Sequence, residues 1–100
     1  MAQMYEVGKH ATAIATGEDG KTRVTYHSTI VVEFDNEIVT LNTGGWETVT
    51  TKTRMNQTSN KFRLGYQVYQ KNYQWYIWFP GTDREEIPFE GRKVSFQRKA

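Results

Sequence analysis

The sequence contains no cysteine, so neither a disulfide nor a thiolate metal site can reinforce the fold. That absence suits a reducing compartment. No apolar run approaches the roughly 18 residues that a membrane-spanning helix needs, and the first residues do not resemble a signal peptide. We therefore expect one cytoplasmic domain over residues 1–100 that has no membrane partner, because this length is typical of a single domain.

The sequence also lacks the signatures of an active site. Its three serines lie in no nucleophile-elbow pattern, and Gly44-Gly45 is not followed by the Lys-Ser/Thr of a phosphate-binding loop. Glu85 and Glu86 are adjacent, and neighbouring residues of a strand point to opposite faces, so they do not form a carboxylate pair. We expect a non-catalytic protein that uses no cofactor.

Metal ligands are scarce as well. The turn residues Gly17–Gly20 predict a hairpin in which Thr16 faces Lys21, Ala13 faces Val24 and His10 faces His27. Two histidines are too few for zinc, which takes three protein ligands in catalytic sites and four in structural ones. We therefore expect no bound metal.

Alternating apolar and polar residues continue along the next segment and predict a second hairpin. The pattern extends from residue 22 to Phe34, which is long for one strand, so we expect a bulge or bend near Ser28. A two-residue turn at Asp35-Asn36 would place Val39 opposite Val32. The two glycines that follow break the sheet, and we expect Trp46 after them to lie in the core.

Two more hairpins are predicted in the second half of the chain. With a turn at Lys71-Asn72, one face of residues 64–79 is wholly apolar and Val68 faces Trp75. With a turn at Glu90-Gly91, Ile87 faces Val94. Pro88 cannot donate a backbone hydrogen bond, so we expect its strand at a sheet edge.

The segment between the second and third hairpins favours a short helix over about 51–61. Its β-branched start is typical of a strand, but its lysine, arginine, methionine and glutamine favour a helix. Thr51 is a suitable N-cap, and Met55, Ser59 and Phe62 share one helical face. We predict an α+β fold with a mainly antiparallel sheet of consecutive hairpins. An all-β barrel is the alternative, if 48–54 is a strand.

Residues 48–79 hold five bases, no acid and eight of the fourteen aromatic residues. Strand alternation places Tyr69, Tyr76 and Trp78 on the face opposite the apolar residues, beside Gln67, Gln74 and Lys71. Three aromatic side chains that the core does not need form a candidate recognition surface, unless another layer buries them. The candidate binding residues are Lys52, Arg54, Lys61, Arg63, Tyr69, Lys71, Tyr76 and Trp78.

Two functions fit such a surface, and a homodimer through it is a further expectation. The aromatic residues could anchor a partner protein, with Arg54 and Arg63 at the rim of the contact. Alternatively, they could stack the bases of a single-stranded nucleic acid while the lysines and arginines contact phosphates.

The runs VTYHSTIVVEFD and TLNTGGWETVTTKTRMNQTSNKFRLGYQVYQKNYQWY resemble a set of small uncharacterised proteins encoded by bacteriophages and prophages. The resemblance covers roughly residues 22–79. It implies expression in a bacterial host cell and an accessory role, and it carries over no functional residue. Because accessory proteins of this kind often contact host proteins, we rank protein binding before nucleic-acid binding.

Overall fold

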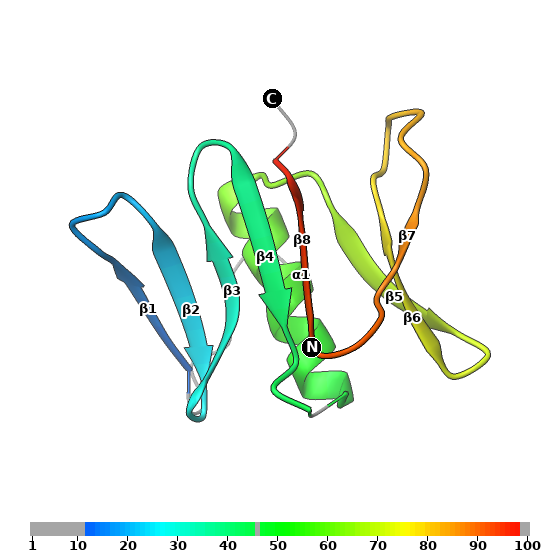
Figure 1. Cartoon of the computed structure of the whole chain (residues 1–100), viewed down its shortest axis with the longest axis horizontal. Helices are drawn as coiled ribbons and strands as arrows, with labels where there is room; N and C mark the ends of the chain where they lie inside the picture. The colour runs from blue at the N-terminus through cyan, green and yellow to red at the C-terminus, as the bar shows by residue number, and fades with distance from the viewer. Residues whose placement is uncertain (1–11, 46, 99–100) are drawn as a thin grey trace.

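The computed structural model describes residues 12–45 and 47–98, which form two antiparallel sheets and one helix (Figure 1). A five-stranded sheet has the order β1-β2-β3-β4-β8, and a three-stranded sheet has the order β5-β6-β7. The elements are β1 (Thr12–Thr16), β2 (Thr22–Tyr26), β3 (Thr29–Phe34), β4 (Ile38–Asn42), α1 (Val49–Phe62), β5 (Gln67–Lys71), β6 (Gln74–Trp78), β7 (Ile87–Pro88) and β8 (Lys93–Gln97). The α+β prediction is confirmed, and the two sheets do not close into a barrel.

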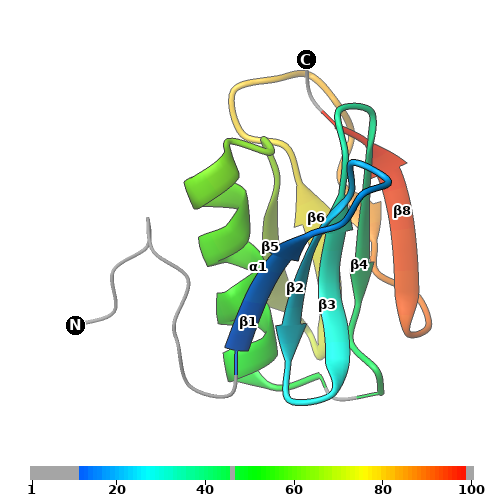
Figure 2. The same ribbon diagram turned by 90° about the vertical axis from the view of Figure 1, so that its left-hand side faces the viewer.

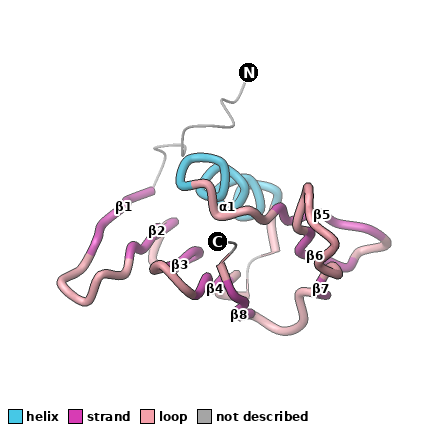
Figure 3. The backbone as a smooth tube through the Cα atoms, turned by 90° about the horizontal axis from the view of Figure 1, so that it is seen from above, coloured by secondary structure: helices cyan, strands magenta, loops and turns pink. Residues whose placement is uncertain are grey.

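The helix lies against one face of the five-stranded sheet (Figure 2) and also packs on β5 of the smaller sheet. Seen from above, β1 lies at one end of the molecule and the three-stranded sheet at the other (Figure 3). The apolar faces of both sheets and of α1 therefore meet in one core. No helix in the described part of the chain is long and apolar enough to cross a membrane.

The helix begins two residues earlier than predicted. Thr48, rather than Thr51, is the N-cap, and its side-chain oxygen accepts a hydrogen bond from the backbone N–H of Thr51 at 3.2 Å. This cap outweighs the strand preference of the β-branched residues that follow it. The helix ends at Phe62, and the C-cap residue Arg63 adopts the left-handed conformation with φ 55°. Met55 and Ser59 are buried, as the helical spacing predicts.

The register of the first hairpin is one residue away from the prediction. Thr16 pairs with Thr22, so Ile14 faces Val24 and Ala13 faces Thr25. The reason is a five-residue loop, in which the Asp19 side chain accepts a hydrogen bond from the N–H of Lys21 at 3.1 Å. The predicted pair of His10 and His27 rests on a residue outside the described part of the chain, as does the placement of Trp46 in the core.

The predicted long strand is in fact two strands, β2 and β3, which reverse direction at His27-Ser28. A two-residue turn does not interrupt the alternation of apolar and polar residues, so the sequence pattern does not reveal that the chain reverses there. The bulge occurs instead between Val24 and Thr25, opposite β3. It turns Val31 inward beside Val32 and leaves Ile30 40% exposed.

Two further registers differ from the prediction by two residues. Val39 pairs with Phe34, because the Asp35 side chain accepts hydrogen bonds from the N–H groups of Glu37 and Ile38 within the four residues that lie between the pair. Val68 pairs with Ile77, because the turn between β5 and β6 lies at residues 72–73 and not at 71–72. A shift of two residues keeps each side chain on its face, so the predicted inner and outer faces of β5 and β6 are unchanged.

The predicted fourth hairpin does not form. β7 pairs with β6, whereas β8 crosses to the other sheet and pairs with β4, so that Phe96 lies opposite Val39. The crossing lets Phe89 and Phe96 both enter the core, where they are almost fully buried. Pro88 lies at the edge of the three-stranded sheet, as predicted.

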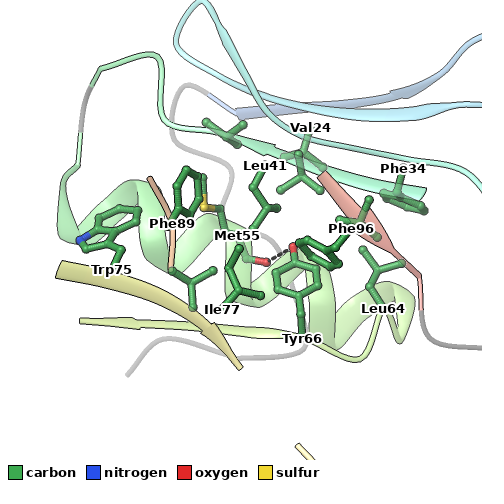
Figure 4. Close-up of a cluster of buried hydrophobic side chains, with 14 of the residues drawn as sticks. Val24, Phe34, Leu41, Met55, Leu64, Tyr66, Trp75, Ile77, Phe89 and Phe96 are labelled. Atoms are coloured by element: carbon green, nitrogen blue, oxygen red, sulfur yellow. Dashed lines mark hydrogen bonds between the residues drawn. The ribbon is translucent and has the colours of Figure 1, made fainter. Parts of the chain in front are cut away.

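The core is built from both sheets and the helix (Figure 4). Tyr66 lies at its centre, and its hydroxyl donates a hydrogen bond to the backbone oxygen of Met55 at 2.7 Å. Burial raises the pKa of the Tyr66 phenol well above its usual value. The large apolar residues are Val24, Val31, Val32, Phe34, Val39, Leu41, Met55, Leu64, Tyr66, Val68, Trp75, Ile77, Phe79, Phe89 and Phe96.

Candidate binding face

The face of the three-stranded sheet that points away from the core carries the predicted aromatic residues. We call it the outer aromatic face, and its members on β5 and β6 are Gln67, Tyr69, Lys71, Gln74, Tyr76 and Trp78. The observed register sets them in three cross-strand pairs, Gln67 with Trp78, Tyr69 with Tyr76, and Lys71 with Gln74. Trp78 is 49% exposed, and both tyrosines are half-buried.

The two tyrosines form a stacked pair at the centre of this face. Their ring centroids are 5.5 Å apart and the ring planes are inclined by 25°. The Tyr69 hydroxyl donates a hydrogen bond to a carboxylate oxygen of Glu86, in the segment before β7. This bond raises the pKa of Tyr69 to about 12, because the carboxylate favours the protonated phenol.

We expect the Tyr69 phenol to titrate near pH 12 in the folded protein, and Glu86→Gln to return its pKa toward the ordinary value of 10.0. Since the pKa is raised on folding, the bond to Glu86 contributes to stability below pH 10 and is lost as the pH rises from 10 toward 12. Ring resonances followed by NMR against pH would measure this, with Tyr69→Phe for assignment. An unchanged pKa in Glu86→Gln would contradict the role of the carboxylate.

Tyr73 is a candidate residue that the sequence reasoning missed. It lies at the tip of the β5–β6 hairpin, where Asn72 and Tyr73 have φ of 52° and 65°, and its side chain is 94% exposed. A two-residue turn of this kind favours Asn-Gly, and a residue with a side chain costs about 1–2 kcal/mol in the left-handed conformation. The prediction placed the turn one residue too early, at Lys71-Asn72, and so did not single out Tyr73.

Of the five predicted bases, the outer aromatic face contains only Lys71. Arg54 is buried under the five-stranded sheet, where its Nε donates to Thr12 Oγ1 at 3.0 Å and its Nη1 donates to Gln57 Oε1 at 3.4 Å. The guanidinium also lies 5.5 Å from the ring centroid of Tyr26. The structure thus assigns Arg54 to packing of the helix against the sheet.

The remaining bases lie along or just after α1. Lys52 Nζ is 6.0 Å from the ring centroid of Trp75. Lys61 and Arg63 line a groove of about 470 Å³ together with Gln67, which belongs to the outer aromatic face. The structure therefore brings Lys61 and Arg63 to the border of the face at its Trp78 end.

A second hollow, of about 430 Å³, lies near the start of α1, and most of the residues that line it are serine, threonine or tyrosine. Thr48 and Thr51 hydrogen-bond to each other there, and Thr43 Oγ1 accepts from the N–H of Gly45. His27 is among the residues that line this hollow. Across residues 12–45 and 47–98, no three histidine, aspartate or glutamate side chains lie close enough together to hold a metal ion.

The family comparison covers most of the chain. Residues 1–95 match the model of a family described as Kyanoviridae Gp96 protein. No curated protein and no solved structure matches the chain. The match confirms the resemblance to small phage-encoded proteins, and the chain belongs to the Kyanoviridae Gp96 protein family, a bacteriophage family.

Proposed function

We propose that this phage protein is a non-catalytic accessory protein that binds a host or phage protein in the cytoplasm of the bacterial host. The observation that carries the proposal is the outer aromatic face, where a stacked tyrosine pair lies beside the half-exposed Trp78. Aromatic residues of this kind are the usual anchors of protein interfaces, because each buries a large area on contact. These rings are not part of the hydrophobic core, which is packed by side chains on the opposite face of the same strands.

The conformation of Tyr73 supports the same proposal. Glycine would fit its turn better, so an exposed tyrosine there costs folding stability without gaining contacts in the core. Residues that lower stability in this way cluster at functional sites. A tyrosine at the hairpin tip extends the aromatic surface toward a partner.

The charges around the face favour a protein over a nucleic acid. Arg54 is buried and the Glu86 carboxylate lies within the face, which opposes contact with phosphates. Lys61 and Arg63 at the border suit carboxylates at the rim of a protein partner. Single-stranded nucleic acid is the second candidate, since the same two cations could contact phosphates beside a stacking surface.

Affinity capture from infected cells, with and without nuclease, would test the proposal. We expect a nuclease-resistant protein partner whose binding falls at least tenfold in Trp78→Ala. Tyr73→Gly should also weaken binding while it stabilises the fold, so the loss cannot be attributed to unfolding. The matched control is Ile38→Ala, which removes a 41% exposed apolar side chain from the other sheet and should leave binding unchanged.

Two results would contradict the protein-binding proposal. Partners that disappear with nuclease would favour the nucleic-acid function. A partner retained at full strength by both Trp78→Ala and Tyr73→Gly would show that binding uses another surface.

A further inference from the structure

The two sheets have four edge strands, and three of them are protected against pairing with another chain. On β5, the Asn56 side chain donates to the Val68 backbone oxygen at 2.9 Å and accepts from the Val68 N–H at 2.7 Å. On β8, Arg84 donates to the backbone oxygen of Gln97 at 3.0 Å. β7 is two residues long and ends in Pro88. Covering side chains, short strands and proline are the usual ways in which edges are protected.

Among the residues that the structure describes, Ile14 and Thr16 of β1 have none of these devices beside them. Its residues Thr12–Thr16 carry no charge and no proline, and residues 13–16 are exposed. Among the described residues, no side chain from elsewhere in the chain bonds to the backbone of Ile14 or Thr16. Such an edge is a template for another strand.

The hydrogen-bond pattern of β1 points the backbone N–H and C=O groups of Ile14 toward this open edge. Gly17 donates its N–H to the oxygen of Lys21 at 2.9 Å, which makes these two residues a hydrogen-bonded pair of the antiparallel ladder. Hydrogen-bonded and non-bonded pairs alternate, so Ile14, opposite Val24, is in a non-bonded pair. Its N–H and C=O therefore point away from β2, toward the free side of the strand.

The sequence of β1, TAIAT, reads the same in both directions, with Ile14 at its centre. We propose that β1 pairs antiparallel with β1 of a second copy of the chain, about a two-fold axis at Ile14. Each Ile14 then donates its N–H to the other and accepts in return, and Ala13 lies opposite Ala15. A two-fold interface must be self-complementary, and a palindromic strand centred on an outward-facing residue meets that requirement.

Side chains and charge agree with this pairing. Ile14 is 40% exposed in the single chain and would contact its own copy, because residues in a hydrogen-bonded antiparallel pair have Cα atoms about 5.5 Å apart. No like charges meet, since β1 has none. The contact joins the two five-stranded sheets and leaves the outer aromatic face free at the far ends of the dimer (Figures 1 and 3).

Sedimentation equilibrium of the full chain over a range of concentrations would test the dimer. We expect a monomer–dimer equilibrium that Ile14→Lys shifts to monomer, because lysine on an edge strand opposes pairing. Circular dichroism would show that this variant remains folded. Trp78→Glu, which would break a dimer formed through the outer aromatic face, should leave the equilibrium unchanged.

Because the chain has no cysteine, a single introduced thiol gives a second test. Ile14→Cys should form a disulfide-linked dimer on mild oxidation, since the expected Cα separation is within the range for a disulfide. Ile38→Cys is the matched control, because Ile38 is exposed to nearly the same degree, 41% against 40%, and should not cross-link. A monomer at every concentration, equal cross-linking of the two variants, or a dimer that only Trp78→Glu dissociates would overturn the proposal.

Discussion

Phe79→Ala is expected to lower the free energy of unfolding by about 3–5 kcal/mol. Phe79 is 1% exposed and lies where the two sheets meet, with its ring 5.3 Å from that of Phe96 and the Arg84 guanidinium 3.8 Å from its centroid. Removing the ring leaves a cavity between elements that the sheets hold apart, so the site cannot collapse fully. Urea unfolding should show a midpoint lower by roughly 2 M, given the usual slope for a small domain.

The matched control for Phe79→Ala is its neighbour Trp78→Ala. Trp78 is as large but points to the outer aromatic face and is 49% exposed, so its removal should cost less than about 1 kcal/mol. The two variants thus compare neighbouring aromatic side chains, one in the core and one on the outer aromatic face. Equal destabilisation would mean that the outer aromatic face is part of the core and would remove the basis of the proposed binding site.

Asn56→Leu is expected to cost about 2–3 kcal/mol, because it removes both partners of the Val68 backbone groups. Leucine has nearly the same shape as asparagine, so lost hydrogen bonds rather than lost packing would account for the change. Asn56→Asp should fall between wild type and leucine, since a carboxylate accepts from the Val68 N–H but cannot donate to the Val68 oxygen.

Hydrogen exchange gives a local measurement of the same contact. The Val68 amide should exchange faster in Asn56→Leu than in the wild type, while amides of β3 keep their protection. An Asn56→Leu protein with wild-type stability and an unchanged Val68 exchange rate would show that the asparagine does not hold α1 to β5.

The sequence predicted which face of the sheet each side chain lies on better than it predicted which strands pair with each other. The period of two along residues 64–79 assigns Val68 and Ile77 inward and Trp78 outward, and it does so even when the register is shifted by two. No local signal showed that the chain after Glu90-Gly91 crosses to the other sheet. That choice depends on the burial of Phe96 against residues about 55 positions earlier.

The candidate site was predicted in part, because local spacing determines some of its residues and contacts distant in the sequence determine the others. Tyr69, Tyr76 and Trp78 share a face because neighbouring strands of a hairpin must align, and that follows from local spacing. Arg54 was predicted to be a surface cation, but it pairs with Thr12, 42 positions away, and no helical pattern reveals such a partner. Glu86 joins the face through a segment whose path depends on the whole fold.

The pairing of β8 with β4 has a consequence for the speed of folding. Thr40 and Ser95 hydrogen-bond through their hydroxyl groups at 2.8 Å although 55 positions separate them, and the helix and the whole three-stranded sheet lie between. The hairpins within β1–β4 and within β5–β6 close short loops and can form in microseconds. We expect β8 to pair with β4 only after the intervening chain has been ordered. Closing such a long loop costs conformational entropy, and the stabilising contacts between β4 and β8 form only once the loop is closed. We therefore expect β8 to join the five-stranded sheet late in folding, so that β4 is an edge strand until then.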